Sequence, residues 1–468
     1  MKQTGGRMAD YTHAPIGPLF FKTALPIVFL MSVNGLFTVV DAIFLGWFVG
    51  PDALAGVTLM FPLLMMFIAL ASLVANGMAS VMARQLGAGE LDKARESFAG
   101  AHGLSGLTCV LLLVLFIAGG APLVELAANG SQALAEPGYL YLLITVIASP
   151  LAFAVGLQTT ALRVEGWIGF MAGIGVLVTL ANIGLNYVLI ALLGWGVAGS
   201  AIGSAIAQAV GLGVVLVFRL RGQTSLPAFA LPWKAWRTGW RSFLALGAPQ
   251  SLSFLGLSLG SGTIIIMLQA TAGDSYETVV AAYGITMRLL SFSFLGLMGM
   301  AQALQAMIGN NYGAGRPDRV AQSLRLGVIC GLVYAASAEA IFHFGARGLA
   351  GLFVEDPAVI AEVGRILPVI VAAYVLAGPA VMISTHFQAI GDAPRAAILS
   401  LSRTYLFAIP LTLTLPLWLG EWGVWWAGPT AEVLMLGLTL IVLTQTARQR
   451  GYRFGLIPPA GDRQALAA

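Results

Sequence analysis

Long apolar runs constrain this chain more than any other feature of its sequence. They recur along nearly the whole length of 468 residues, and each reaches the roughly 20 residues that a helix needs to cross a hydrocarbon layer. Hydrophobic residues make up 58% of the chain and charged residues only 9%, whereas a soluble domain carries about 25% charged residues. The sequence therefore predicts an all-α integral membrane protein that crosses the bilayer many times.

Charged or Gly/Pro-rich breaks divide the apolar runs into twelve predicted spans, which begin near residues 18, 53, 94, 137, 167, 197, 240, 277, 319, 359, 395 and 422. Alternate loops then hold 21 of the 24 basic residues, and the opposite loops are mostly acidic, with Arg347 as an exception. Basic loops face the cytoplasm by the positive-inside rule. We therefore expect a cell (inner) membrane location with both termini cytoplasmic, and no nucleic-acid partner.

Matching residues in the two halves of the chain indicate an internal duplication. Pro26 and Pro249 are 223 residues apart, and Gly166 and Gly391 are 225 apart. Six spans in each half give both copies the same orientation, as in transporters built from parallel repeats. The predicted domains are an N-terminal six-helix lobe at 1–218 with a tail at 1–17, a cytoplasmic linker at 219–241, a C-terminal six-helix lobe at 242–447 and a cytoplasmic tail at 448–468.

One carboxylate interrupts the first predicted span. Asp41 lies in the middle of the apolar stretch SVNGLFTVVDAIFLGWFVG, and Asn34 and Thr38 share its helix face because their spacing is i, i+4, i+7. Asn182 and Asn186 repeat this device in the fifth span, and Ser204 belongs to a polar stripe in the sixth. All three stripes are expected to meet in the outer half of the N-terminal lobe.

A carboxylate inside a span costs about 2.5 to 3.5 kcal/mol on insertion scales, so it needs partners or a function. Amides and hydroxyls can bond to either protonation state of Asp41, and a low dielectric favours the neutral form. We predict that proton binding and substrate binding at Asp41 are alternatives that switch the N-terminal lobe between two packings. The competing interpretation is a buried acid that only joins helices through hydrogen bonds.

Several motifs resemble the multidrug and toxic compound extrusion (MATE) family. They are LPIVFLMSVNGLFTVVDAIFLGWFVGPDALAG, GMASVMARQLGAGELDKAR, NIGLNYVLIALLGWGVAGSAIGSAIAQ, AQALQAMIGNNYGAGRPDRV, QAIGDAPR and GVWWAGPTAEV. They extend over almost the whole chain, and GNNYGAGRPDRV is the most specific of them. The resemblance implies two six-helix lobes in a V shape around a central cavity. It also implies export of organic cations or amphipathic drugs, driven by inward H⁺ or Na⁺.

The resemblance also assigns residues. It places Asp41, Asn182, Asn186 and Ser204 in a cation or substrate site, with Gln158 or Thr159 contributed by the fourth span. With the helix-face stripe added, we predict a coupling-ion site at Asp41, Asn182 and Asn186. The predicted substrate site consists of Asn34, Thr38, Asp41, Gln158, Thr159 and Ser204. Some relatives have an acid where Asn186 stands, and its absence favours H⁺ over Na⁺. The seventh span has no acid, which resembles the DNA-damage-inducible F-like branch.

Pro26, about 15 residues before Asp41, interrupts the hydrogen-bond ladder of the first span and permits a kink. A gating bend and a static kink are equally consistent with its position.

Three more charges, Arg288, Glu339 and Glu432, lie deep in predicted spans of the C-terminal half. A buried arginine needs a carboxylate, so we expect Arg288 to pair with Glu339 or Glu432. The alternative for this group is attraction of substrate or a second proton site.

Other functions and partners follow from the same residues. A flippase for lipid-linked intermediates would need a strongly cationic cavity, to which this sequence contributes mainly Arg288. An intramembrane enzyme is disfavoured because H-E-x-x-H and G-x-S-x-G are both missing from the sequence. A passive channel would need no titratable group. We expect a monomer that contacts membrane lipids and small-molecule cargo, without a metal or cofactor.

Overall fold

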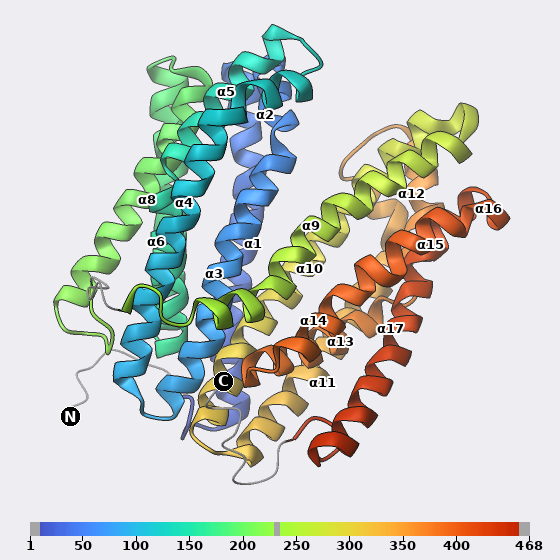
Figure 1. Cartoon of the computed structure of the whole chain (residues 1–468). Coiled ribbons are helices and arrows are strands. Elements are labelled where there is room, and N and C mark those ends of the chain that lie inside the picture. Colours follow the sequence, from blue (N-terminus) through green and yellow to red (C-terminus); the bar gives the residue numbers. More distant parts are fainter. Residues whose placement is uncertain (1–9, 229–234, 458–468) are drawn as a thin grey trace. The chain divides into compact units, whose positions relative to one another are not determined.

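A computed structural model describes residues 10–228 and 235–457, with the side chains of residues 36–39, 42 and 274 excepted. Helices dominate this part of the chain (Figure 1). Ten helices are long and apolar enough to cross a membrane, or up to twelve spans if each of two bent pairs counts as one. Among the described residues, strand-like pairing is limited to one isolated bridge between Arg453 and Ile457. The predicted all-α fold class is confirmed.

The first half of the chain forms eight α-helices and one π-helical turn. Their bounds are α1 Ile16–Phe48, α2 Pro51–Leu59, α3 Phe61–Gly87, α4 Leu91–Ala127, α5 Gln132–Ile147, α6 Ser149–Glu165, α7 Ile168–Asn186, η1 Tyr187–Leu192 and α8 Gly196–Leu220. Helices α5 and α6 form one span bent by 52°. Helix α6 packs against α4 and α8, and α7 packs against α8 (Figure 1).

The second half repeats this plan with more interruptions. Its elements are α9 Trp240–Thr271, η3 Gly273–Ser275, α10 Tyr276–Gly313, α11 Pro317–Ala350, α12 Pro357–Ile370, η4 Tyr374–Leu376, α13 Ala377–Ile390, α14 Ala393–Leu401, η5 Ser402–Ala408, α15 Ile409–Thr414, α16 Pro416–Leu419 and α17 Glu421–Arg450. The span built from α12, η4 and α13 is bent by 49°. A buried cluster that includes Val363, Ile366 and Trp425 joins its helices.

Backbone geometry supports the internal duplication. Gly166 ends α6 with φ of 94° and Gly391 ends α13 with φ of 90°. Gly89 and Gly315, in the matching Gly-Ala-Gly loops, have φ of 75° and 68°. Such left-handed positions favour glycine because it has no Cβ. The two halves therefore share their turn geometry as well as their sequence spacing.

Contacts divide the chain into two compact units. The first unit contains residues 10–14 and the described part of 29–251, and the second contains 15–28 and the described part of 252–468. The first boundary falls inside α1, two residues after Pro26, and the second falls inside α9, two residues after Pro249. In the second unit, Gly299 admits the α1 backbone, because a Cβ there would lie 2.7 Å from Val28 Cγ2. The domain limits expected from the sequence stay a prediction.

The chain that follows α8 lies against the first unit. A Cβ on Gly100 would lie 1.9 Å from the carbonyl oxygen of Thr238, and one on Gly103 would lie 2.2 Å from that of Trp236. The indole nitrogen of Trp240 donates a hydrogen bond of 2.8 Å to Gly100 O. Glycines on α4 thus let the linker backbone approach the helix surface closely.

Candidate functional site

The Asp41 carboxylate joins three helices of the first unit. Its Oδ1 accepts a hydrogen bond of 2.7 Å from Asn186 Nδ2 on α7 and one of 2.8 Å from Ser200 Oγ on α8. Asn186 and Ser200 are fully buried, whereas Asp41 is half-buried. Two neutral donors on a single oxygen stabilise the ionised carboxylate without cancelling its charge.

Two further hydrogen bonds extend this polar contact along α7. One turn from Asn186, the side-chain amide of Asn182 donates to Ser204 Oγ at 2.7 Å. Nearly one further turn away, Thr179 Oγ1 donates to Asn34 Oδ1 at 3.1 Å. Helix α7 therefore makes three polar contacts, alternately with α1 and α8. The side chain of Thr38, which was predicted to join this stripe, lies outside the described residues.

The amide oxygens of both asparagines are buried and unused. Asn182 Oδ1 and Asn186 Oδ1 have no hydrogen-bond partner among the described residues. Gly203 makes room for the second of them, because a Cβ at that position would lie 2.6 Å from Asn186 Oδ1. Beside the carboxylate, the first unit thus holds buried acceptors that can bond to a proton donor or coordinate a cation.

An apolar cluster lies next to the site, one helical turn after Asp41 on α1. Leu45, one turn beyond Asp41, packs with Ala53, Ile190 and Val197, and Tyr141 of α5 packs against this cluster. Tyr141 also interacts electrostatically with Asp41. Our sequence reasoning missed Tyr141, which no periodic pattern marks, and left Ser200 out of the site although it shares a stripe with Ser204.

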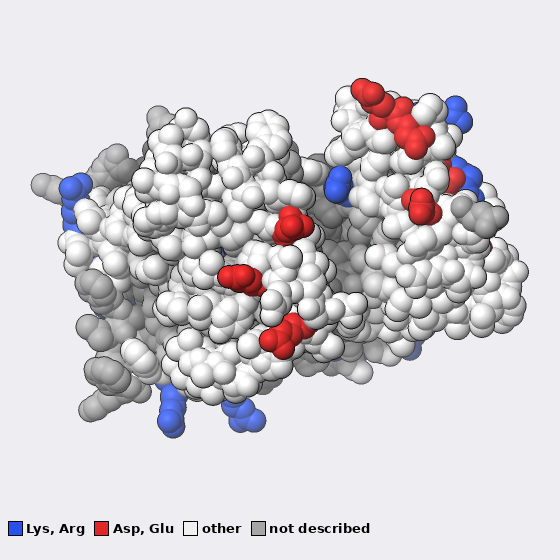
Figure 2. Space-filling view, turned by 90° about the horizontal axis from the view of Figure 1, so that it is seen from above, with Lys and Arg blue, Asp and Glu red and all other residues white. Residues whose placement is uncertain are grey.

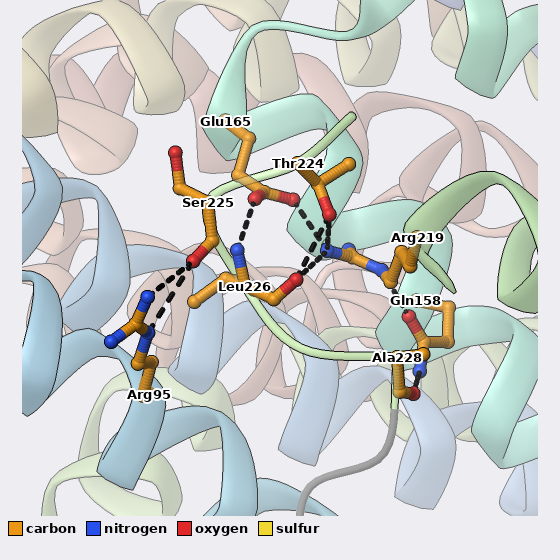
Figure 3. Close-up of polar contacts among 8 residues, drawn as sticks. All are labelled: Arg95, Gln158, Glu165, Arg219, Thr224, Ser225, Leu226 and Ala228. Atoms are coloured by element: carbon orange, nitrogen blue, oxygen red, sulfur yellow. Dashed lines mark hydrogen bonds and ion pairs between the residues drawn. The ribbon is translucent and has the colours of Figure 1, made fainter. Parts of the chain in front are cut away.

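Gln158 and Thr159 do not join the Asp41 contacts. Gln158 Oε1 accepts a hydrogen bond of 2.6 Å from Arg219 Nε, and its amide donates to Ala228 O at 3.3 Å (Figure 3). Thr159 Oγ1 bonds to the carbonyl of Val155 in its own helix at 2.8 Å. The described contacts of Gln158 thus anchor the linker rather than complete the predicted substrate site.

A buried ion pair lies at the centre of this linker anchor. Arg219 Nη1 is 2.9 Å from Glu165 Oε2, and their side chains are 0% and 2% exposed. The other carboxylate oxygen accepts a hydrogen bond of 3.0 Å from Leu226 N, and Arg219 also contacts Thr224 Oγ1 at 3.2 Å (Figure 3). We call Arg219, Glu165 and Gln158 the linker anchor. It satisfies polar groups of α6, α8 and the linker together.

The secondary candidates occupy three separate environments in the second unit. Arg288 is exposed and has no ion pair among the described residues. Glu339 accepts a hydrogen bond of 2.7 Å from Val375 N, at the bend before α13. Glu432 Oε1 accepts a hydrogen bond of 2.5 Å from Arg403 Nε.

The expected pairing of Arg288 is therefore wrong. Arg403 lies in η5, inside the long helix Ala393–Leu419. This position lets it reach Glu432 on α17 and replaces Arg288 as that acid's partner.

Pro26 and His386 have clear structural settings. Helix α1 continues through Pro26 as an α-helix, next to the boundary between the two contact units. His386 is fully buried, and its Nε2 is 2.7 Å from Leu456 O in the chain after α17. His386 thus contacts the C-terminal segment.

Comparison with known proteins identifies the family. The MatE family model matches residues 26–188 and 249–414, which together exceed half of the chain. The protein belongs to the MATE family. Its members are membrane transporters, so this chain is a multi-pass membrane transporter and not an enzyme.

Two relatives and one solved structure illustrate the similarity. A FAD transporter of Shewanella oneidensis is 26% identical over 443 residues, 92% of this chain and 95% of the relative. The multidrug export protein MepA of Staphylococcus aureus is 22% identical over 446 residues, 92% of this chain and 94% of the relative. An outward-facing multidrug resistance MATE transporter of the MOP superfamily is 22% identical. It gives a TM-score of 0.84 and covers 94% of this chain and 97% of its own.

Proposed function

We propose that this transporter exports organic cations or amphipathic drugs from the cell in exchange for H⁺, with Asp41 as the titratable coupling group. The hydrogen-bonded carboxylate of Asp41 carries this proposal. Asn186 and Ser200 donate to its ionised form. Once a proton binds, the new O–H needs an acceptor, and Asn186 Oδ1 is a buried acceptor with no donor among the described residues. Both protonation states therefore have partners, which reversible proton loading requires.

The electrical energy available to such a site is sufficient for uphill transport. One elementary charge that crosses 100 mV gains about 2.3 kcal/mol. That amount supports roughly a fifty-fold cargo gradient for each net positive charge that the exchange moves inward. A one-for-one exchange of H⁺ for a monovalent cation moves no net charge, so it is driven by the pH gradient. Protonation of Asp41 removes the charge that attracts a cationic cargo, so the two ligands compete.

Na⁺ is the alternative coupling ion. The oxygens of Asp41, Asn182 and Asn186 are hard ligands of the kind that such a cation prefers. Only one of these groups carries a charge, and the amide at 186 replaces the second acid of some relatives. We therefore place H⁺ first, and we keep the assignment to the DNA-damage-inducible F-like branch as a prediction.

Orientation is part of the same proposal. Acidic side chains are spread over the face seen in Figure 2, and they include outer-loop residues of the first unit near α2 and α5. The basic loops belong to the opposite ends of the spans by sequence. We propose a cell (inner) membrane location with both termini cytoplasmic and export toward the acidic face. We also propose a monomer.

The cargo class draws support from the relatives. One is named a multidrug export protein and another a FAD transporter. The half-buried Asp41 carboxylate favours cations at the first unit, which agrees with the former name. Flavin nucleotides are a second candidate cargo because the FAD transporter matches 92% of this chain.

Proteoliposomes test the proposal directly. Counterflow of a fluorescent organic cation is measured while H⁺ and Na⁺ gradients are imposed separately. We expect a H⁺ gradient to drive uptake of the cation by transporters that are inserted in the inverted orientation. Asp41→Asn should abolish this gradient-driven uptake while membrane insertion stays normal. Glu125→Gln, at an exposed acid of the same unit, is the matched control and should keep wild-type rates. Full driven transport by Asp41→Asn, or coupling to Na⁺ alone, would refute H⁺ coupling through Asp41.

A further inference from the structure

The second unit has a polar centre that the Asp41 mechanism does not use. Arg403 lies in η5, a π-helical turn at Ser402–Ala408 within an otherwise α-helical span. Such turns are rare, and they often occur at functional sites. Arg403 reaches the carboxylate of Glu432, one of the buried residues of α17, so its side chain points toward the packed side of that helix.

The contact with Glu432 engages only part of the arginine. Nε donates to Glu432 Oε1 at 2.5 Å, and neither terminal nitrogen, Nη1 or Nη2, has a hydrogen-bond partner in the described chain. The Arg403 side chain remains 48% exposed, whereas that of Glu432 is 5% exposed. A salt bridge between an arginine and a carboxylate frequently has two parallel N–H···O hydrogen bonds from the guanidinium. Here the carboxylate orients the guanidinium and leaves its terminal fork available.

Glu432 is also incompletely bonded. Its Oε2 is buried and has no partner within the described residues. An unsatisfied carboxylate oxygen beside an open guanidinium fork is costly unless a further group occupies the place. The terminal nitrogens of Arg403 are donors and Glu432 Oε2 is an acceptor. Together they suit a ligand that presents an anionic oxygen pair to Arg403 and a hydroxyl or other donor to Glu432.

One tyrosine adjoins this pair, and a second lies beyond it. Tyr374 of η4 interacts electrostatically with both Arg403 and Glu432. Its hydroxyl is 3.1 Å from Ser293 Oγ, and Tyr334 of α11 donates to Ser293 O at 2.9 Å. Glu339, a nearby acid of α11, is already bonded to Val375 N at 2.7 Å. The surroundings thus add hydroxyl groups to Arg403 rather than a second competing carboxylate.

We infer that Arg403, with Glu432 and Tyr374, forms a binding subsite for a carboxylate or phosphate group in the second unit. The bound anion takes the two terminal nitrogens of Arg403, a fork geometry that matches carboxylate and phosphate oxygens. Glu432 holds the guanidinium by Nε and accepts from a hydroxyl of the same ligand. The phosphate can come from cargo or from a lipid headgroup. The inference rests on the proposed function for the role of the subsite in transport. The binding itself is measured without transport.

A matched pair of probes isolates the anionic group. Flavin mononucleotide and riboflavin share one ring system and differ by a phosphate, and flavin fluorescence reports their binding to the full-length protein. In a glycoside detergent that carries no phosphate, we expect flavin mononucleotide to bind about tenfold or more tightly than riboflavin, as for a charge-assisted hydrogen-bond pair. Arg403→Gln should reduce this ratio to about one, and Arg403→Lys should restore part of it because it keeps the charge without the fork.

Removal of Arg403 alone leaves Glu432 buried without its cation, so Arg403→Gln combined with Glu432→Gln serves as the second variant. It should fold and show no preference for the phosphate. Arg325→Gln, at an exposed arginine of the same unit, should keep the full preference. Equal binding of both flavins to the wild type, or a preserved preference in the double variant, would overturn the inference.

Two further arms separate the sources of the anion and the two proposals. Loss of the preference when phosphatidylglycerol is added to the detergent micelles identifies a lipid phosphate as the occupant, and an unchanged preference identifies a free phosphate. Both results support the subsite. Asp41→Asn should leave the preference unchanged, so a failure of H⁺ coupling and a failure of anion binding are read independently.

Discussion

The side-chain amide of Asn186 donates a hydrogen bond of 2.7 Å to Asp41 Oδ1. The buried amide oxygen of Asn186 lies only 2.6 Å from the point that a Cβ on Gly203 would occupy. A single amide therefore connects the carboxylate to the packing of α7 against α8. Any change in the protonation of Asp41 acts on this amide first. The packing around residue 186 is thus where coupling can be tested without removing the carboxylate.

Gly203→Ala tests that connection. The added methyl group would lie 2.6 Å from Asn186 Oδ1, so the amide must turn away from Asp41 or the helices must separate. We expect driven transport to fall by about tenfold, with a loss of stability of roughly 1 to 3 kcal/mol from overpacking. Gly213→Ala on the same helix meets nothing within 4 Å and serves as the control. Equal behaviour of the two variants in transport and thermal unfolding would contradict the prediction.

Asn186→Asp changes the charge of the site without changing its shape. It places a second carboxylate 2.7 Å from Asp41, and two acids this close share a proton because both cannot easily be ionised together. We expect the pH optimum of efflux to rise and a dependence on Na⁺ to appear, since two carboxylates hold a cation better than one. Efflux is measured across pH in Na⁺-free and Na⁺-containing buffers. An unchanged profile in both buffers counts against a shared site.

The linker anchor predicts a large stability effect. Glu165→Gln leaves the Arg219 guanidinium buried without its counter-charge, and breaking such a pair costs about 3 to 5 kcal/mol. Lys93→Gln removes an exposed pair with Glu90 and should cost about 0 to 1 kcal/mol. Thermal unfolding in detergent compares the two. Similar midpoints for both variants would mean that the anchor contributes little.

His386→Phe should release the segment after α17. The histidine is fully buried and its Nε2 lies 2.7 Å from Leu456 O, a contact that phenylalanine cannot make. Trypsin should then cleave at Arg450 or Arg453 about tenfold faster, because local opening controls access when reclosing is fast. His343→Phe changes an exposed histidine and should leave the rate unchanged. Mass spectrometry of the fragments identifies the cleaved bonds.

The sequence predicted the helices well because the signal for membrane spans is local. Apolar runs near 20 residues long specify a spanning helix regardless of what packs against it. Eleven of the twelve predicted starts lie within five residues of a long helix or bent pair, whereas the start predicted near 53 falls in α2, eight residues before the spanning helix α3. The polar stripe was readable for the same reason, since i, i+4 and i+7 positions share a face. Asp41 and Asn186 were thus placed in one region before any contact was known.

The partners of individual charges were not readable. Arg403 lies in a predicted span, but nothing in the sequence indicated that η5 would direct its side chain toward Glu432. Gln158 shares the buried face of α6 with Glu165, but the linker that binds both lies about 60 to 70 residues further along the chain. Periodicity identifies a face of a helix, and only tertiary packing determines what touches it.

The division of α1 has a consequence for the order in which the molecule is completed. Residues 15–28 group with the second unit, whose other members begin at residue 252. They leave the ribosome well before the surface that covers them, which includes Gly299 against Val28. Translation must therefore proceed beyond α10 before the first helix of the chain acquires all its neighbours. A truncated chain that ends at the linker would insert its spans and still lack the packing of its own N-terminal helix.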